Sequence, residues 1–165
     1  MFLVRLLLLV AAFAAACHPG GEYQGGTSML SGLDRGETNG RMFDFVSNRS
    51  EGDDWNIRLR GTSMYVSYGD GDKVNDLGTQ NITDKESDKV WDLIDKVDIP
   101  SRGKGKKDED AGYVELRLRE PGEDKHDIYT CYIPRDNDNI DDDVAGLIEY
   151  LQKLVKRHFK TDPNF

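Results

Sequence analysis

The C-terminal part of the chain contains the amphipathic pattern that most constrains the fold. From about Asp142 to Phe159, apolar residues recur at helical spacing. These residues are Val144, Leu147, Ile148, Leu151, Leu154 and Val155. Aspartates precede this segment and Lys and Arg residues end it, which suits the dipole of a helix, and His158 in the last turn is expected to do the same. A helix with so wide an apolar stripe needs a second layer beneath it, and we expect that layer to be a sheet.

Strict alternation of apolar and polar residues predicts the strands of that sheet. Residues 55–60 alternate, Gly61-Thr62 permits a tight reversal, and residues 64–68 alternate again, which predicts a hairpin. Residues 114–119 and 128–133 predict a second hairpin around Pro121-Gly122. Shorter strands are expected around Phe43 and Phe45 and over residues 77–82.

A second helix is expected directly after Thr83. Thr83-Asp84-Lys85-Glu86 matches the capping box, in which the threonine hydroxyl and the glutamate carboxylate each accept a hydrogen bond from the other residue's backbone N–H. Val90, Ile94 and Val97 form its apolar stripe, and Pro100 ends it. Residues 101–110 are rich in Gly, Lys and acids and are expected to form a solvated loop.

The order hairpin, helix, hairpin, helix predicts an α+β domain whose antiparallel sheet carries both helices on one face. It also suggests a duplicated ββα unit. By alternation, the residues expected to face the helices are Ile57, Leu59, Val114, Leu116 and Leu118. Those expected on the opposite face are Asn56, Arg58, Arg60, Glu115, Arg117 and Arg119.

Four arginines would therefore share one sheet face: Arg58, Arg60, Arg117 and Arg119. The planar fork of arginine suits a carboxylate or phosphate partner, so this stripe is the candidate binding face. The alternative is that these arginines pair across strands with Glu115 and nearby acids. Aromatic residues in the same strands, namely Trp55, Tyr65, Tyr68, Tyr129 and Tyr132, are divided by the same alternation between core and surface.

The N-terminus has the features of an export signal. Arg5 precedes an apolar run, residues 6–16, that is too short to span a bilayer as a helix. The run ends in Ala14-Ala15-Ala16-Cys17, and small residues directly before a cysteine resemble the lipobox of bacterial lipoproteins. That resemblance implies cleavage before Cys17 and acyl chains, such as palmitate, on this residue. The alternative is an ordinary secretory signal with an Ala-x-Ala cleavage site, which would leave Cys17 unmodified and the protein secreted.

The rest of the chain is expected to be a tether and one domain. Residues 17–41 are Gly-rich and polar, as flexible linkers are, and residues 42–165 are long enough for a single core. Loss of residues 1–16 changes the formal net charge from −9 to −10. Such a charge argues against nucleic-acid partners and against adhesion to anionic lipid, so any membrane contact should come through the lipid on Cys17.

Residues that could carry chemistry are few. His126, in an acidic turn, could act as a general base, although a solvated turn residue is the simpler interpretation. Cys131 lies in a strand-like run, where a lone cysteine is usually a small buried hydrophobe. Two acidic stretches are weak calcium candidates, with Asp70 and Asp72 in one and Asp136 and Asp138 in the other. Neither matches the EF-hand pattern. The alternative is that they are solubilising loops and helix caps.

Two functions of different class remain open. The first is a non-catalytic binding or structural module in the cell envelope, tethered by lipid to a bacterial membrane, on the outer-membrane or periplasmic side. It would bind a protein or an anionic ligand. The second is a periplasmic hydrolase or inhibitor-like module that uses His126 with neighbouring acids. The sequence has no motif for a cofactor or for a zinc site.

Overall fold

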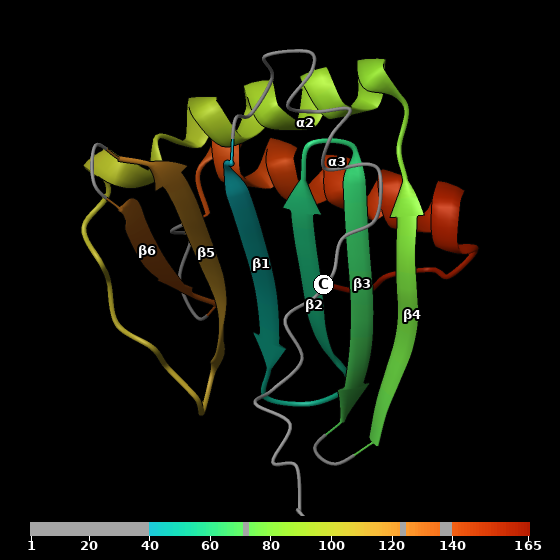
Figure 1. Cartoon of the computed structure of the whole chain (residues 1–165). Coiled ribbons are helices and arrows are strands. Elements are labelled where there is room, and N and C mark those ends of the chain that lie inside the picture. Colours follow the sequence, from blue (N-terminus) through green and yellow to red (C-terminus); the bar gives the residue numbers. More distant parts are fainter. Residues whose placement is uncertain (1–39, 71–72, 123–124, 136–139) are drawn as a thin grey trace, which may run out of the picture.

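Six strands form one antiparallel sheet, and two helices cover one of its faces (Figure 1). The computed structural model describes residues 40–70, 73–122, 125–135 and 140–165. The proposed signal peptide, Cys17 and nearly all of the proposed tether lie outside these residues. The strands are β1 (Met42–Arg49), β2 (Asp54–Arg60), β3 (Ser63–Asp70), β4 (Lys73–Asn81), β5 (Gly112–Pro121) and β6 (His126–Pro134). The helices are α2 (Asp84–Val97), the short 3-10 helix η1 (Ile99–Ser101) and α3 (Asp142–Phe159).

The strand order is β4-β3-β2-β1-β5-β6, so the first strand of the sequence lies in the middle of the sheet. Strands β1 to β4 form a meander, and after α2 the chain returns to place β5 against the free side of β1. The predicted α+β class, with an antiparallel sheet and both helices on one face, is confirmed. The ββα duplication stays a prediction. Four strands precede α2, whereas only β5 and β6 lie between α2 and α3, so the two halves differ in their number of strands.

The local signals in the sequence act where they were expected. Thr83 is the N-cap of α2 and forms the complete capping box with Glu86. The helix ends at Val97, its C-cap Asp98 has a left-handed backbone, and Pro100 follows within η1. Asp141 caps α3 by accepting a hydrogen bond from the backbone N–H of Val144 at 3.0 Å. None of the helices in the described residues is both long and apolar enough to span a membrane.

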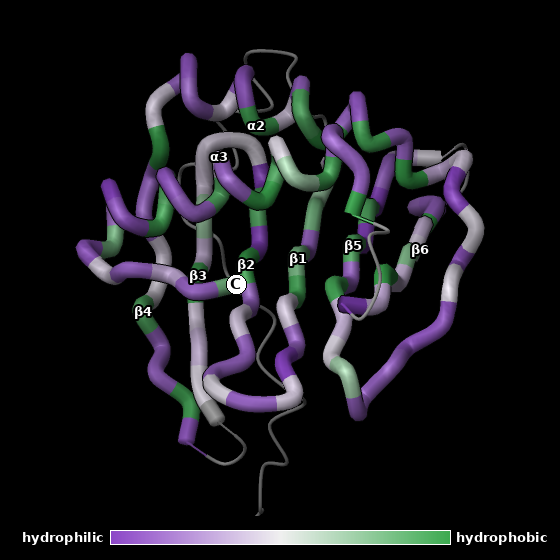
Figure 2. The backbone as a smooth tube through the Cα atoms, turned by 180° about the vertical axis from the view of Figure 1, so that it is seen from behind, coloured by the Kyte–Doolittle hydropathy of each residue, from purple (hydrophilic) through white to green (hydrophobic). Residues whose placement is uncertain are grey.

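The core lies between the sheet and the two helices. All five residues expected to face the helices, Ile57, Leu59, Val114, Leu116 and Leu118, are buried there. Figure 2, seen from the helix side, shows polar and apolar positions alternating along β2. Cys131 is also buried in this core, as predicted, and burial raises the pKa of its thiol.

The last residues of the chain complete the core beyond the end of α3. The ring of Phe165 lies 5.0 Å from that of Phe45 and 5.5 Å from that of Trp55, measured between centroids. The indole N–H of Trp55 donates to the side-chain oxygen of Asn164 at 2.8 Å, and Tyr68 stacks on the same indole at 4.5 Å. This segment therefore covers the part of the core that Phe45 and Trp55 form.

The loop between η1 and β5 acts as a strap along the edge strand β6. The backbone N–H of Tyr132 donates to the carbonyl oxygen of Lys104 at 2.8 Å. At Gly105, where φ is +68°, a Cβ atom would lie 2.1 Å from the carbonyl oxygen of Tyr132, so only glycine fits there. The strap satisfies a backbone group on an edge that would otherwise be open to another strand.

Candidate functional site

The sheet face opposite the helices, called here the open face, carries the four candidate arginines. Because β1 lies between β2 and β5, Asp44 is in register with Arg58 on one side and Arg117 on the other. Met42 is likewise in register with Arg119. The arginines thus come from two strands that do not touch, with Asp44 and Met42 between them. Sequence alternation placed them on one face but did not indicate this separation.

The arginines of β2 already have protein partners. The Nε of Arg58 donates to the carboxylate of Asp44 at 2.5 Å, and the Arg58 side chain keeps 41% of its exposed area. A guanidinium N–H of Arg60 contacts the sulfur of Met42 at 3.7 Å. Cross-strand pairing therefore occurs for Arg58, with Asp44 as the acid rather than Glu115.

The arginines of β5 have no such partner among the residues that the structure describes. Neither Arg117 nor Arg119 makes an ion pair with another residue in the part of the chain that the structure describes, and both are half-buried. Their positions two residues apart on one strand separate their Cα atoms by about 7 Å on the same face. Thr130 and Ile128 of β6 are in register beside them.

Aromatic residues are divided between the two faces. Tyr65 is in register with Arg58, and Tyr132 with Glu115, on the open face. Tyr113 meets Tyr132 edge to face at 5.9 Å, and the ammonium group of Lys107 lies 4.9 Å from the centre of the Tyr113 ring. The other expected aromatics, Trp55, Tyr68 and Tyr129, pack in or against the core.

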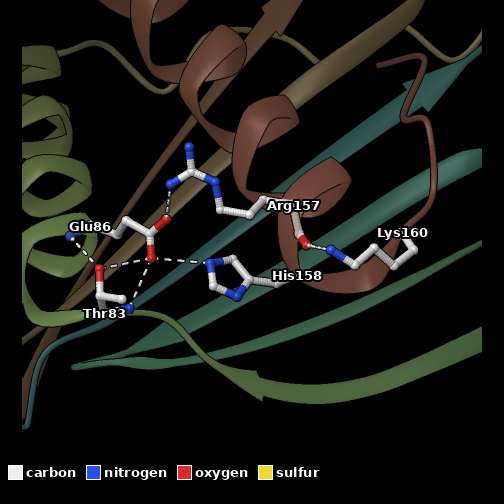
Figure 3. A network of polar contacts seen from close by, with 5 residues as sticks. All are labelled: Thr83, Glu86, Arg157, His158 and Lys160. Carbon is white, nitrogen blue, oxygen red and sulfur yellow. Dashed lines mark hydrogen bonds and ion pairs between the residues drawn. The ribbon is translucent and has the colours of Figure 1, made fainter.

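A carboxyl group with a strongly lowered pKa lies elsewhere, where α2 meets α3 (Figure 3). One carboxylate oxygen of Glu86 accepts hydrogen bonds from the backbone N–H and the hydroxyl of Thr83, both at 2.9 Å. The same oxygen lies 3.0 Å from Nε2 of His158. The other oxygen accepts from Arg157 at 2.5 Å. We call these four residues the helix clasp.

The electrostatics of the helix clasp follow from these contacts. Burial would raise the pKa of the Glu86 carboxyl, but the hydrogen bonds from Thr83, Arg157 and His158 outweigh burial and lower that pKa to about 2. A carboxylate of this acidity is a poor general base at neutral pH. The hydroxyl of Ser87, the residue after Glu86, is not free to act as a nucleophile's O–H, because it donates to the carbonyl oxygen of Gly61 at 3.1 Å. The indole N–H of Trp91 donates to the same oxygen at 3.3 Å. The clasp therefore joins the helices and is not arranged as a nucleophile with its base.

His158 lies in the last turn of α3, as expected. The structure also places it against Glu86, 72 positions earlier in the chain. The capping box signalled the partnership of Thr83 and Glu86. No local pattern signalled that Arg157 and His158 would complete it, because that contact depends on how α2 and α3 pack.

The remaining candidates are not assembled into a site. His126 is exposed at the start of β6, opposite Pro121, and its side chain makes no hydrogen bond or ion pair within the described residues. Asp72, Asp136 and Asp138 lie outside the described residues, as does the side chain of Asp70. Across residues 40–70, 73–122, 125–135 and 140–165, no group of three or more His, Cys, Asp or Glu residues is placed to hold a metal ion.

Nearby acids in the two acidic stretches have structural roles. The Asp76 carboxylate accepts from the backbone N–H of Gly78 at 2.8 Å. Besides capping α3, the Asp141 carboxylate pairs with Arg102 at 2.7 Å. Its hydrogen bond from the backbone of Val144 lowers the pKa of Asp141, and the contact with Arg102 lowers it further. Asp76 and Asp141 thus have the turn and helix-cap roles that were the alternative to calcium binding.

No family model matches the chain, and no curated protein is significantly similar to it.

Proposed function

We propose that this protein is a non-catalytic binding module of the bacterial cell envelope, tethered to a membrane by lipid on Cys17. In this proposal the open face is the recognition surface, and its partner is another protein that presents carboxylates. The observation that carries the proposal is the pair Arg117 and Arg119, which lie on the face not covered by the helices and have no described acid partner.

The size and composition of the open face favour a protein over a small ligand. Six strands spaced about 4.8 Å apart, each about 25 Å long, give a face of roughly 600 Å². That is close to the roughly 800 Å² that each partner buries in a standard protein interface. Tyr and Arg are among the residue types enriched in such interfaces, and Tyr65, Tyr132 and the arginines lie on this face.

Charge favours an acidic protein surface over an extended polyanion. The formal net charge of the chain is −9, so a nucleic acid or an anionic membrane would be repelled by most of the molecule. A protein with a few carboxylates in a local patch needs only the arginine cluster to be complementary. The spacing of about 7 Å between Arg117 and Arg119 also matches the repeat of alternate side chains on an extended peptide.

The anchor is tested with Cys17→Ser. We expect the wild-type protein in the membrane fraction and the variant in the soluble fraction, because Cys17 is the acylation site that the lipobox resemblance implies. A wild-type protein that is soluble and carries an unmodified Cys17 by mass spectrometry would exclude the lipid.

The recognition surface is tested with the double variant Arg117→Gln/Arg119→Gln. A matched control is Lys89→Gln/Lys153→Gln, which changes the charge equally at two exposed positions on the helices. Affinity purification from a membrane extract, followed by quantitative mass spectrometry, should recover an acidic partner with the wild type and the control. The loss of two charge-assisted contacts should weaken the binding of this partner to Arg117→Gln/Arg119→Gln by about 10- to 100-fold. Equal recovery with all three proteins would refute a role for these arginines.

A further inference from the structure

We propose that Arg49 and Arg135 form a binding site for a phosphate group at the end of the sheet where β1 and β6 finish. The two residues are far apart in the sequence and follow different strands. The structure brings them to either side of Gly112, the first residue of β5. This inference does not depend on the open face or on the lipid anchor.

Gly112 permits the close approach of the two arginines. Its φ is +85°, and a Cβ atom at this position would lie 3.1 Å from Cα of Arg49 and 3.2 Å from Cδ of Arg135. It would also lie 2.8 Å from the carbonyl oxygen of Asn48. Any other residue would therefore push these groups apart.

The guanidinium of Arg135 is held in place by neutral groups. Its Nε donates to the carbonyl oxygen of Asn48 at 3.0 Å, and Nη2 donates to the hydroxyl of Ser47, which is fully buried. The backbone N–H of Arg135 also donates to the carbonyl oxygen of Gly112 at 3.1 Å. These bonds fix the plane of the guanidinium, and both N–H groups of Nη1 are without a hydrogen-bond partner in the described residues.

Arg49 completes the pair. Its Nη1 donates to the backbone oxygen of Asn164, which leaves Nε and Nη2 to contact a ligand. Burial and the neighbouring charge of Arg49 both lower the pKa of Arg135, as expected when two cations are close.

Neither arginine has an acid partner in the described residues. The nearby carboxylate of Asp54 accepts instead from the side chain of Asn48, at 3.1 Å, and from the backbone N–H of Arg49, at 3.0 Å. A partly buried charge is normally paired. In a chain with 31 acidic and 22 basic residues, two adjacent arginines whose guanidinium groups have no acid partner in the described residues favour an external anion as the partner.

A phosphate group matches this arrangement. Guanidinium groups bind phosphate oxygens with paired, parallel hydrogen bonds, and two guanidiniums balance the charge of a phosphate dianion. The phosphate is that of a soluble ion or the terminal phosphate monoester of a lipid headgroup, since both form the dianion. The competing explanation is that Arg135 only joins the ends of β1 and β6 through its bonds to Ser47 and Asn48.

The test is a thermal shift titration of the protein with inorganic phosphate, with sodium chloride and sodium acetate at equal ionic strength as controls. We expect a saturable rise in melting temperature with phosphate, of about 4 °C at roughly ten times the dissociation constant. Glycerol 3-phosphate is titrated in parallel as a headgroup fragment. Tighter binding of glycerol 3-phosphate would assign the site to a lipid headgroup, and tighter binding of inorganic phosphate to the soluble ion.

Three variants connect the shift to the site. Arg49→Gln should weaken phosphate binding at least about tenfold, and Arg49→Lys should weaken it less, because lysine keeps the charge but not the fork. Lys89→Gln, at an exposed position on α2, should bind as the wild type does. Circular dichroism verifies that each variant is folded. A phosphate response no larger than that to chloride, or an equal response in Arg49→Gln, would overturn the proposal.

Discussion

Replacement of Glu86 by glutamine tests the helix clasp. Glutamine at this position can still accept the hydrogen bond from the backbone N–H of Thr83, so the capping box is retained. The substitution removes the negative charge that faces Arg157 and His158. The variant therefore separates the cap of α2 from the charged contact between α2 and α3.

The expected magnitude follows from the pKa of Glu86. A decrease from an ordinary value near 4.5 to about 2 corresponds to about 3 kcal/mol of folding free energy at neutral pH. Only 8% of the Glu86 side chain is exposed, but Arg157 is 69% exposed and its charge is partly screened by solvent. We therefore expect Glu86→Gln to lower the free energy of unfolding by about 2 kcal/mol at pH 7.

The pH dependence gives a sharper test than the magnitude. A carboxyl group with a lowered pKa stabilises the fold above its unfolded-state value and loses that effect as the pH falls through its folded-state value. The difference between wild type and Glu86→Gln should thus be constant above about pH 5.5 and decrease to roughly 40% of its neutral-pH value at pH 3.

Urea denaturation at several pH values measures both quantities. The signal is the fluorescence of Trp55 and Trp91, the two tryptophans of the chain, both of which are buried. Glu149→Gln, which removes an exposed acid from α3, is the matched control and should change stability by less than about 0.5 kcal/mol. A difference between wild type and Glu86→Gln that is absent at pH 7, or that does not decrease by pH 3, would refute the assigned role of the carboxylate.

Two further substitutions test the elements around the candidate sites. Thr83→Ala should lower the free energy of unfolding by about 1 kcal/mol, measured by urea denaturation, because the hydroxyl caps α2; an unchanged midpoint would contradict this. Gly105→Ala should cost about 1–3 kcal/mol and speed hydrogen exchange of the Tyr132 amide, since its Cβ would collide with the Tyr132 carbonyl. Gly103→Ala, where a Cβ meets nothing within 4 Å, is its control and should be nearly neutral; equal effects would show that the strap is not held at Gly105.

The parts of the fold that sequence reasoning predicted are those encoded by nearby residues. Alternation along β2 and β5 identified the core-facing side of each strand, and the spacing within α3 identified its buried stripe. The capping box fixed the start of α2. Each of these signals involves residues within a few positions of one another, so the local sequence is sufficient to predict the element and its buried side.

The helix clasp and the phosphate site could not be predicted in this way, because each combines residues from distant segments. Glu86 meets His158 only after α2 and α3 have packed side by side on the sheet. Arg49 and Arg135 approach one another only because β5 begins at Gly112 between the ends of β1 and β6. Periodicity indicates which face a residue occupies, but it does not indicate which strand or helix lies beside it.

Strand order also decides what the arginines of the open face can bind. If β2 and β5 were adjacent, Arg58 and Arg117 would repel each other directly across the strand pair. In the observed order, β1 separates them and places Asp44 between them, within 2.5 Å of Arg58. One carboxylate thus engages the arginine of β2 and leaves the two arginines of β5 without an acid partner in the described residues. For this reason we place the contact with an acidic partner on β5, and we expect substitutions in β2 to affect folding more than recognition.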